Sequence, residues 1–387
     1  MTRVAVALTG KTGGEAGEDL GSRVLDQLNG DAPEALLVFA SPQQDHTALL
    51  EGLIGSCRPH VLAGCSSAGE FIGTEAGEGM TCVVGLIAPE MKFTATMGRG
   101  LRENRRAVAE KMAGDFAGLT EPGYRYRSAL VLTDALAGFA DDFVDQLTVL
   151  TGGVYKFFGG GAGDDARFER TFVFCNSEVA TDAAVALEIL SNKPIAVGVR
   201  HGWEPGGENM RVTAAEGMQV GSLNAVPAVE VFDAHAASSG QEFDHDEPVP
   251  FFLHNVLGVD SAEGYHLRVP LSVGEDGSVA CAADVPDGST ACIMSTSSES
   301  AAEAAAWATR TALEQLNGHE PAVALLFDCV ATRLRLGADF GNELSAVQKE
   351  LGDVPLAGFN TYGQIAKAEG QFNGFHNCTA VVCVIPQ

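Results

Sequence analysis

One arrangement of apolar runs, helix-like stretches and glycines recurs along this chain and restricts its fold more than any other feature. The first copy begins with "EALLVFAS" (34–41), passes through a helix-like stretch and a second apolar run, and reaches the turn "GCSSAGE" (64–70). The second copy begins with "SALVLTDA" (128–135) and reaches "GGGAGDD" (159–165). Each copy then enters another apolar run, which predicts the order strand, helix, strand, glycine turn, strand.

A third copy runs from "AVALLFDC" (322–329) to "GFNTYGQ" (358–364). From the first strand to the last glycine of the turn, the spacing is 34 residues in the first two copies and 41 in the third. A helix that connects two strands of one sheet makes those strands parallel, through a right-handed crossover. The repeat therefore predicts an α/β protein with mixed β-sheets covered by helices and organised as two halves.

The glycine turns raise the question of whether they carry a nucleophile or shape the backbone. The pattern around Ser66 does not match the G-x-S-x-G elbow of hydrolases, and the third copy has neither cysteine nor serine in its turn. The copies share glycine, which allows positive φ or close backbone approach. We therefore expect a structural role for Gly69, Gly163 and Gly363, and we expect the three turns to lie near one another around a shared pocket.

Charge and cysteine content exclude several classes of function. The formal net charge of −27 argues against nucleic acid and against anionic membrane surfaces as partners. No apolar run is long enough to span a membrane, and the start of the chain lacks the cleavage region of a signal peptide, so the chain is predicted to be cytoplasmic. The nine cysteines include no C-x-x-C pair, which argues against a zinc knuckle or a thioredoxin-type site.

The region between the second and third copies differs from the repeat. Residues 195–300 alternate in strand fashion with turn signals, and "SESAAEAAAWATRTALEQL" after them predicts a long helix. The predicted division is 1–220, with two repeat units, and 221–387, with a β-rich insert, the long helix and the third unit.

Several motifs together resemble the FIST-domain family: "VLAGCSSAGEF", "FFGGGAGDD", "LLFDCVATRLRLG", "VPLAGFNTYGQI" and "FHNCTAVVCVI". The resemblance extends from about residue 30 to the end and covers the family's N-terminal and C-terminal halves. It implies a sensory, non-catalytic protein that binds a small molecule. The signal would pass to a separate effector, such as a histidine kinase or a cyclic-di-nucleotide signalling enzyme. The resemblance is compatible with a homo-oligomer.

Two alternatives to this function stay open at this stage. One is a haem-based nitric-oxide sensor, as some members of the family are, with His201, His254 or His376 as conceivable axial ligands. The other is a Cys- or Ser-dependent hydrolase. The third turn departs from the family's usual Gly-Glu ending, because here it reads Gly363-Gln364. This change removes a charge from the expected site.

The predicted ligand-binding residues are polar or sulfur-bearing side chains on the turns and at strand ends. They are Cys65, Ser66, Glu70, Asp164, Cys329, Arg333, Tyr362, Gln364, His376 and Asn377. Most of these residues have a structural alternative. The thiols can fill the core, and the acids and Gln364 can cap backbone amides. Arg333 can be a solvated surface cation, and His376 and Asn377 can form a hydrogen-bonded structural pair.

Overall fold

A computed structural model, which describes residues 1–367 and 374–387, consists of three copies of one βαβα unit and a β-rich insert. Each copy has a strand, a helix, a strand, a helix, a strand, a short hairpin and a final strand. The first copy comprises β1 (Arg3–Thr9), α1 (Gly13–Gln27), β2 (Ala35–Ala40), α2 (His46–Cys57), β3 (Val61–Ser66), β4 (Glu70–Ile72), β5 (Glu75–Gly77) and β6 (Thr81–Ile87). The predicted repeat is thus present, and each copy opens with one more strand and helix than expected.

The second and third copies follow the same order of elements. The second comprises β7 (Met91–Arg99), α3 (Leu101–Asp115), β8 (Tyr126–Thr133), α4 (Ala140–Leu150), β9 (Lys156–Gly161), β10 (Val173–Cys175), β11 (Glu178–Ala180) and β12 (Ala183–Ser191). The third comprises β13 (Ala196–Arg200), α7 (Ser298–Gln315), β23 (Pro321–Cys329), α8 (Val330–Leu336), α9 (Phe340–Leu351), β24 (Leu356–Thr361), β25 (Gln364–Ala366), β26 (Gly374–His376) and β27 (Ala380–Pro386).

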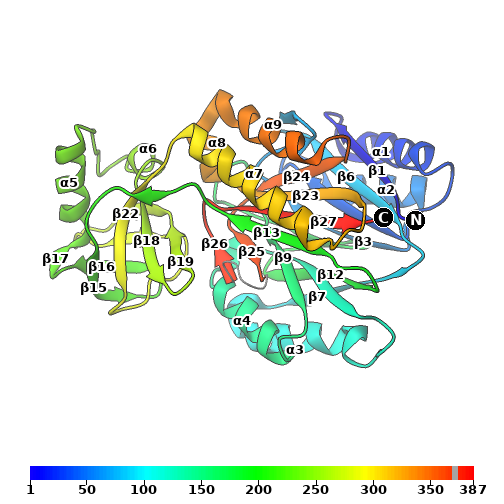
Figure 1. The fold of residues 1–387 in the computed structure, drawn as a ribbon, viewed down its shortest axis with the longest axis horizontal. Helices are drawn as coiled ribbons and strands as arrows, with labels where there is room; N and C mark the ends of the chain where they lie inside the picture. Colours follow the sequence, from blue (N-terminus) through cyan, green and yellow to red (C-terminus); the bar gives the residue numbers. More distant parts are fainter. Residues whose placement is uncertain (368–373) are drawn as a thin grey trace.

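The insert separates β13 from α7 in the third copy. Its elements are β14 (Glu204–Pro205), β15 (Met210–Glu216), β16 (Gln219–Leu223), β17 (Val226–Pro227), α5 (Ala228–Ser239), α6 (Val249–Phe252), β18 (Val256–Ser261), β19 (Gly264–Arg268), β20 (Pro270–Val273), β21 (Val279–Cys281) and β22 (Thr290–Ser295). Figure 1 shows the insert as a separate lobe beside the three-copy core. The division expected at residue 220 falls within β16 of this insert.

The three copies exchange their hairpins in a closed cycle. The first sheet has the order β1-β6-β2-β3-β10-β11, the second β7-β12-β8-β9-β25-β26, and the third β13-β27-β23-β24-β4-β5. Each sheet contains one parallel pair, β2 with β3, β8 with β9, and β23 with β24. Beside that pair lies a hairpin from another copy, so no sheet is complete without its neighbour.

A shared core fills the space among the three sheets. One face of each sheet contributes to it, with Phe39 stacked on Phe359 at 4.5 Å and packed edge-on against Phe327. The outer faces are covered by α1 and α2, by α3 and α4, and by α7 and α9. Strands buried on both faces, such as "ALLVFA" (35–40), therefore read as continuous apolar runs.

The three glycine turns meet and bind one another through the backbone, as expected. The N–H groups of Ala68, Tyr362 and Gly163 donate to the carbonyls of Asn360, Gly161 and Ser66, at 2.9, 3.1 and 2.9 Å. These three bonds form a cycle through the three copies. Gly69 and Gly363 have φ of +126° and +106°, which confirms the structural role expected of these glycines.

The second turn is aligned differently from the sequence-based expectation. In the hydrogen-bond cycle, Gly163 takes the place of Ala68 and Tyr362, not that of Gly69 and Gly363. Its φ is not positive, and an added Cβ would lie 2.7 Å from the Ala68 Cβ. Phe172 corresponds to Gly69, because its carbonyl accepts from the Ser66 N–H just as that of Gly69 accepts from Asn360. The second copy therefore contains an extra loop, residues 164–171, that the equal spacing had concealed.

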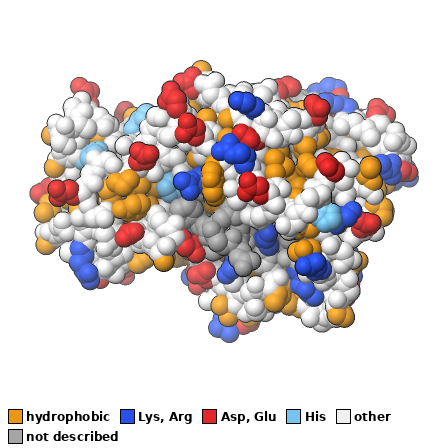
Figure 2. All heavy atoms as spheres, viewed as in Figure 1, with side chains coloured by type: hydrophobic (Ala, Val, Ile, Leu, Met, Phe, Trp, Pro, Cys, Tyr) orange, Lys and Arg blue, Asp and Glu red, His pale blue; other side chains and the backbone are white. Residues whose placement is uncertain are grey.

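Two further observations bear on partners. No helix among residues 1–367 and 374–387 is long and apolar enough to cross a membrane. On the face shown in Figure 2, Lys and Arg side chains are scattered among acidic ones rather than gathered in one basic patch.

Candidate functional site

A pocket of about 300 Å³ lies between the second sheet and the insert. The core side of its wall comes from the segment after β8, the loop at Phe168, Tyr362 and β26, and the insert side comes from β16, β20, β21 and the loop beyond β21. The lining residues are Ala135, Leu136, Gly138, Phe139, Ala140, Asp141, Phe168, Met218, Gln219, Leu271, Ser272, Ala280, Cys281, Ala282, Ala283, Asp284, Tyr362 and Phe375. The site thus lies at the carboxyl end of a parallel strand, where open α/β sheets bind ligands.

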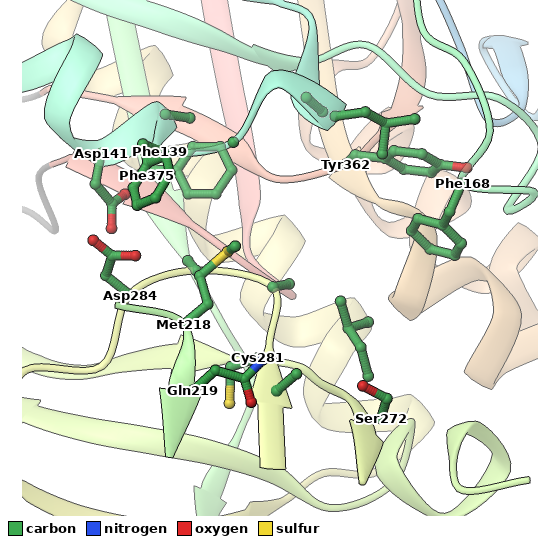
Figure 3. A pocket seen from close by; sticks show the side chains of 18 residues that line it. Phe139, Asp141, Phe168, Met218, Gln219, Ser272, Cys281, Asp284, Tyr362 and Phe375 are labelled. Carbon is green, nitrogen blue, oxygen red and sulfur yellow. The ribbon is translucent and has the colours of Figure 1, made fainter. Parts of the chain in front are cut away.

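Aromatic side chains form much of the pocket wall. Phe168 stacks on Tyr362 with ring centroids 4.6 Å apart, and Phe139 and Phe375 lie near each other at the opposite end (Figure 3). Phe139 is 41% exposed and Phe168 49% exposed. Large aromatic side chains that stay exposed beside a cavity are typical of ligand sites.

The end of the pocket beside Phe375 is acidic. Asp141 and Asp284 point toward each other there (Figure 3), one from the first turn of α4 and the other from the insert. Arg268 donates to the Asp141 carboxylate at 3.2 Å and to the Asp284 backbone carbonyl at 2.7 Å. With both acids ionised, the three side chains leave one net negative charge.

Burial governs the charge state of this acidic group. Burial raises the pKa of Asp141, the Arg268 guanidinium opposes this shift and the Asp284 carboxylate adds to it, and the resulting pKa is about 6. In the part of the chain that the structure describes, the Oδ1 atoms of Asp141 and Asp284 are buried without a hydrogen-bond partner. Such atoms are costly unless a partner is supplied, and a positively charged hydrogen-bond donor would supply it.

Of the ten predicted ligand-binding residues, Tyr362 alone lies in the wall of this pocket. Its hydroxyl donates to the Asp164 carboxylate, which also accepts from the N–H groups of Phe168, Glu169 and Arg170. Asp164 therefore caps the extra loop and holds the two stacked rings in place, and it does not occupy the position that matches Glu70.

Cys65, Ser66 and Glu70 lie at the first turn, away from the pocket. Cys65 is fully buried, and burial raises the pKa of its thiol well above the ordinary value, which disfavours the thiolate. The Ser66 hydroxyl donates to the Gly163 carbonyl at 2.7 Å and accepts from the Phe172 N–H at 2.9 Å. Both residues serve the packing of the turns.

Glu70 and Arg333 form a second polar group at the first turn. Glu70 accepts from the Ser67 hydroxyl and from the Met80 N–H, and burial raises the pKa of its carboxyl to about 8. Arg333 lies against Gly69 and pairs with Glu78. Arg333 does not line the pocket at the second sheet, and its role as a ligand clamp stays a prediction.

Cys329, Gln364, His376 and Asn377 come together behind the pocket wall. The Gln364 amide bonds the Thr361 hydroxyl and the Thr379 backbone. Asn377 accepts from the Val269 N–H at 3.4 Å, which ties the insert to the core. His376, buried and stacked near His266, has its pKa lowered well below the ordinary value by burial. These side chains support the wall and do not line it.

The residues predicted from the sequence include neither of the pocket acids and only one of the pocket aromatics, Tyr362. Phe139 and Asp141 occur in "GFADDF" (138–143), directly after a predicted strand, and the carboxyl-end rule could have selected them. The repeat predicts a helix after this strand and gives no separate signal for a site. Asp284 and Met218 come from the insert, which has no counterpart in the other copies, so the repeat gave no signal for them.

The pocket does not fit haem. Among the described residues that line it, none is a histidine, two are carboxylates, and a porphyrin is larger than a cavity of about 300 Å³. His201 is engaged elsewhere, with one ring nitrogen bonded to the Tyr265 carbonyl at 2.9 Å and the other to the Trp203 N–H at 3.2 Å. Haem binding stays a prediction of the resemblance, and a visible absorption spectrum of the purified protein tests it.

This chain is similar in sequence to proteins of mycobacteria. An uncharacterized protein of Mycobacterium tuberculosis is 25% identical over 94% of this chain and 94% of its own. One of Mycobacterium bovis is 24% identical over 95% and 94%. Among solved structures, Thermotoga maritima PurL complexed with ADP covers 99% of this chain and 71% of its own at 11% identity, but its TM-score of 0.23 does not establish a common fold. The FIST N domain matches residues 34–226 and the FIST C domain residues 228–367, so the chain belongs to the FIST family of sensory and signalling domains.

Proposed function

We propose that this protein is a sensor that binds a small organic cation in the pocket between the second sheet and the insert. The observation that carries the proposal is the group Asp141, Asp284 and Arg268, which has a net charge of −1 at one end of an aromatic-walled cavity. A ligand with one ammonium or guanidinium group and an apolar body would neutralise this charge and cover the rings.

The aromatic walls favour the same class of ligand. A cation held within about 6 Å of an aromatic ring is attracted to the face of that ring, with about 0.5–2 kcal/mol in favourable cases. Phe139 and Phe375 lie at the same end of the pocket as the acids (Figure 3), and the Phe139 ring already holds one cation, the Arg105 guanidinium, 4.5 Å from its centroid. The volume of about 300 Å³ limits the ligand to the size of a small amine.

The placement of the pocket supports a sensory role. Core and insert each supply one of the two acids, and the Oδ1 atoms of both are covered. A shift of the insert relative to α4 would expose these atoms to a cation. A ligand that pairs with them in one arrangement and not in the other has the differential affinity that moves an equilibrium.

The proposal also covers how the sensor passes its signal on. We infer that the ligand-dependent position of the insert is recognised by a separate effector, such as a histidine kinase or a cyclic-di-nucleotide signalling enzyme. Membership of a sensory family supports this inference.

Calorimetry with matched ligands tests the binding step. Phenethylamine should bind, phenethyl alcohol should bind at least tenfold more weakly, and phenylacetate should not bind. The variant Asp284→Asn should weaken the amine at least tenfold, which corresponds to about 1.4 kcal/mol, and leave the alcohol unchanged. Glu230→Gln, an exposed acid on α5 of the insert that does not line the pocket, is the matched control. Equal affinities for the amine and the alcohol would refute the proposed ligand class.

A further inference from the structure

A strained loop supplies part of the wall of the ligand pocket. The extra loop of the second copy, residues 164–171, contains three non-glycine residues with positive φ: Asp165, Ala166 and Phe168, at +56°, +60° and +55°. Such values are uncommon for residues with a side chain, and for a bulky residue they are outliers. The loop contains no glycine, the residue that adopts this conformation without a steric cost. The loop therefore holds its side chains at a cost in backbone energy.

Aromatic residues in this strained conformation are confined to the pocket. Among the aromatic residues in 1–367 and 374–387, Phe139 and Phe168 alone have positive φ, at +54° and +55°. Both are exposed and both line the pocket, one at each end (Figure 3). Strained backbone of this kind clusters at ligand sites, where the position of a side chain serves binding rather than stability.

Hydrogen bonds fix the backbone that carries Phe168. The Asp164 carboxylate accepts from the N–H groups of three consecutive residues, 168–170, at 2.7–2.9 Å. The Asp164 backbone carbonyl accepts from the Arg167 N–H at 3.2 Å. A strained conformation persists only where the surrounding structure imposes it, and four bonds to one buried residue do so here. The loop is thus built to hold Phe168 in one place.

The protein supports one face of the Phe168 ring. Tyr362 stacks on it with the ring centroids 4.6 Å apart and the ring planes 19° from parallel. The Tyr362 hydroxyl is in turn bonded to Asp164, so the same residue fixes both rings. Phe168 nevertheless stays 49% exposed. The face that Tyr362 does not cover is therefore available to a second ring.

We propose that Phe168 is the specificity-determining residue of the pocket and selects ligands whose apolar body is a planar aromatic ring. The ring of the ligand stacks on the open face of Phe168, and an amine attached to it reaches toward Asp141 and Asp284 at the other end. Paired rings with centroids about 4.5–7 Å apart gain more free energy than burial alone supplies. This inference deepens the proposed function and rests on the pocket as the ligand site, but not on the charge of the ligand.

Two amines of equal charge separate stacking from plain apolar burial. Phenethylamine and cyclohexylethylamine carry the same ammonium group on the same two-carbon chain, and only the first has a flat π face. The cyclohexyl ring has the larger apolar surface, so burial alone favours cyclohexylethylamine. Stacking on Phe168 reverses this order. In calorimetry with the full chain, we expect phenethylamine to bind about threefold to tenfold more tightly.

A variant assigns this preference to Phe168. Phe168→Leu removes the ring face and keeps an apolar side chain, so the preference for phenethylamine should disappear or reverse. Trp307→Leu is the matched control, because Trp307 is also an exposed aromatic residue, has the Arg200 guanidinium 4.8 Å from its ring centroid, and does not line the pocket. This control should keep the preference of the parent.

Equal binding of the two amines by the parent, or tighter binding of cyclohexylethylamine, would overturn the inference. A preference that survives Phe168→Leu would also overturn it. The comparison on the parent decides the question even if the variant does not fold.

The neutral pair phenethyl alcohol and cyclohexylethanol separates this inference from the proposed function. If the alcohols show the same preference for the aromatic member, and the amines bind no more tightly than the alcohols, the cationic ligand class is wrong and the selection of a flat ring holds. If no member of either pair binds, both proposals are wrong.

Discussion

Gly358→Ala is expected to destabilise the protein severely, although it adds one methyl group. A Cβ at this position would lie 2.0 Å from the Leu326 carbonyl oxygen on the adjacent parallel strand, whereas carbon–oxygen contacts normally exceed about 3.3 Å. The strands β23 and β24 would have to separate by more than about 1 Å, which lengthens their ladder hydrogen bonds beyond the usual range. Overpacking costs about 1–3 kcal/mol, and we expect about 3 because the clashing atom is backbone.

Differential scanning calorimetry measures this effect. With an unfolding entropy of about 2.1 cal/mol/K per residue, a loss of 3 kcal/mol lowers the Tm by roughly 4 °C. Gly64→Ala should behave alike, because its Cβ would lie 2.1 Å from the Val38 carbonyl in the first copy. Gly114→Ala is the control: its Cβ meets nothing within 4 Å, and alanine in a helix is neutral or favourable. If Gly358→Ala melts like Gly114→Ala, the close strand approach does not constrain this position.

Three further predictions concern the turns. Gly363→Ala should lower the Tm, because φ is +106° and the added Cβ would lie 2.1 Å from the Phe375 ring; an unchanged melt would contradict this. In Glu70→Gln, the free energy of unfolding should depend less on pH than in the parent. The folded pKa of Glu70, about 8, exceeds the unfolded value of 4.5, so the parent loses stability as pH rises from 4.5 to 8, by at most about 1.4 kcal/mol per pH unit. Denaturant titrations at several pH values measure this dependence, and an equal dependence in both proteins would contradict the prediction. Tyr362→Phe should lower the free energy of unfolding by about 1–3 kcal/mol, because it removes the hydroxyl bonded to the buried Asp164. The affinity for phenethylamine should stay unchanged, because the ring remains. A tenfold loss of affinity with an unchanged melt would show that the hydroxyl serves the ligand and not the fold.

The repeat allowed the fold class to be predicted but not the way in which the copies join. The continuous apolar runs and the equal spacings predicted parallel strand pairs covered by helices. The structure contains these parallel pairs and the helices that cover them. The exchange of hairpins among sheets leaves no local signal, since β4 reads the same whether it pairs within its own copy or with β24. Equal spacing also aligned the second turn wrongly by one residue. It matched Gly163 with Gly69, although Gly163 takes the place of Ala68 in the hydrogen-bond cycle, and the many glycines of the second turn hid this shift.

The ligand site was less accessible to prediction than the fold. The turns drew attention to Cys65 and Ser66, whose hydrogen bonds and burial hold the copies together. The pocket depends on an insert that packs against one copy, and the partnership of Asp141 with Asp284 spans two segments with no pattern in common. Tertiary contacts of this kind appear only once the insert is placed.

The most direct test of the sensor is the distance between core and insert with and without an amine. All nine native cysteines are buried, so spin labels can be directed to the introduced pair Val149→Cys on α4 and Ala237→Cys on α5. Pulsed electron paramagnetic resonance then measures the distance distribution with saturating phenethylamine, and with phenylacetate as control. We predict that the amine shifts the distribution and the acid does not. A distribution unchanged at a concentration where calorimetry shows the pocket occupied would contradict a sensor that works through movement of the insert.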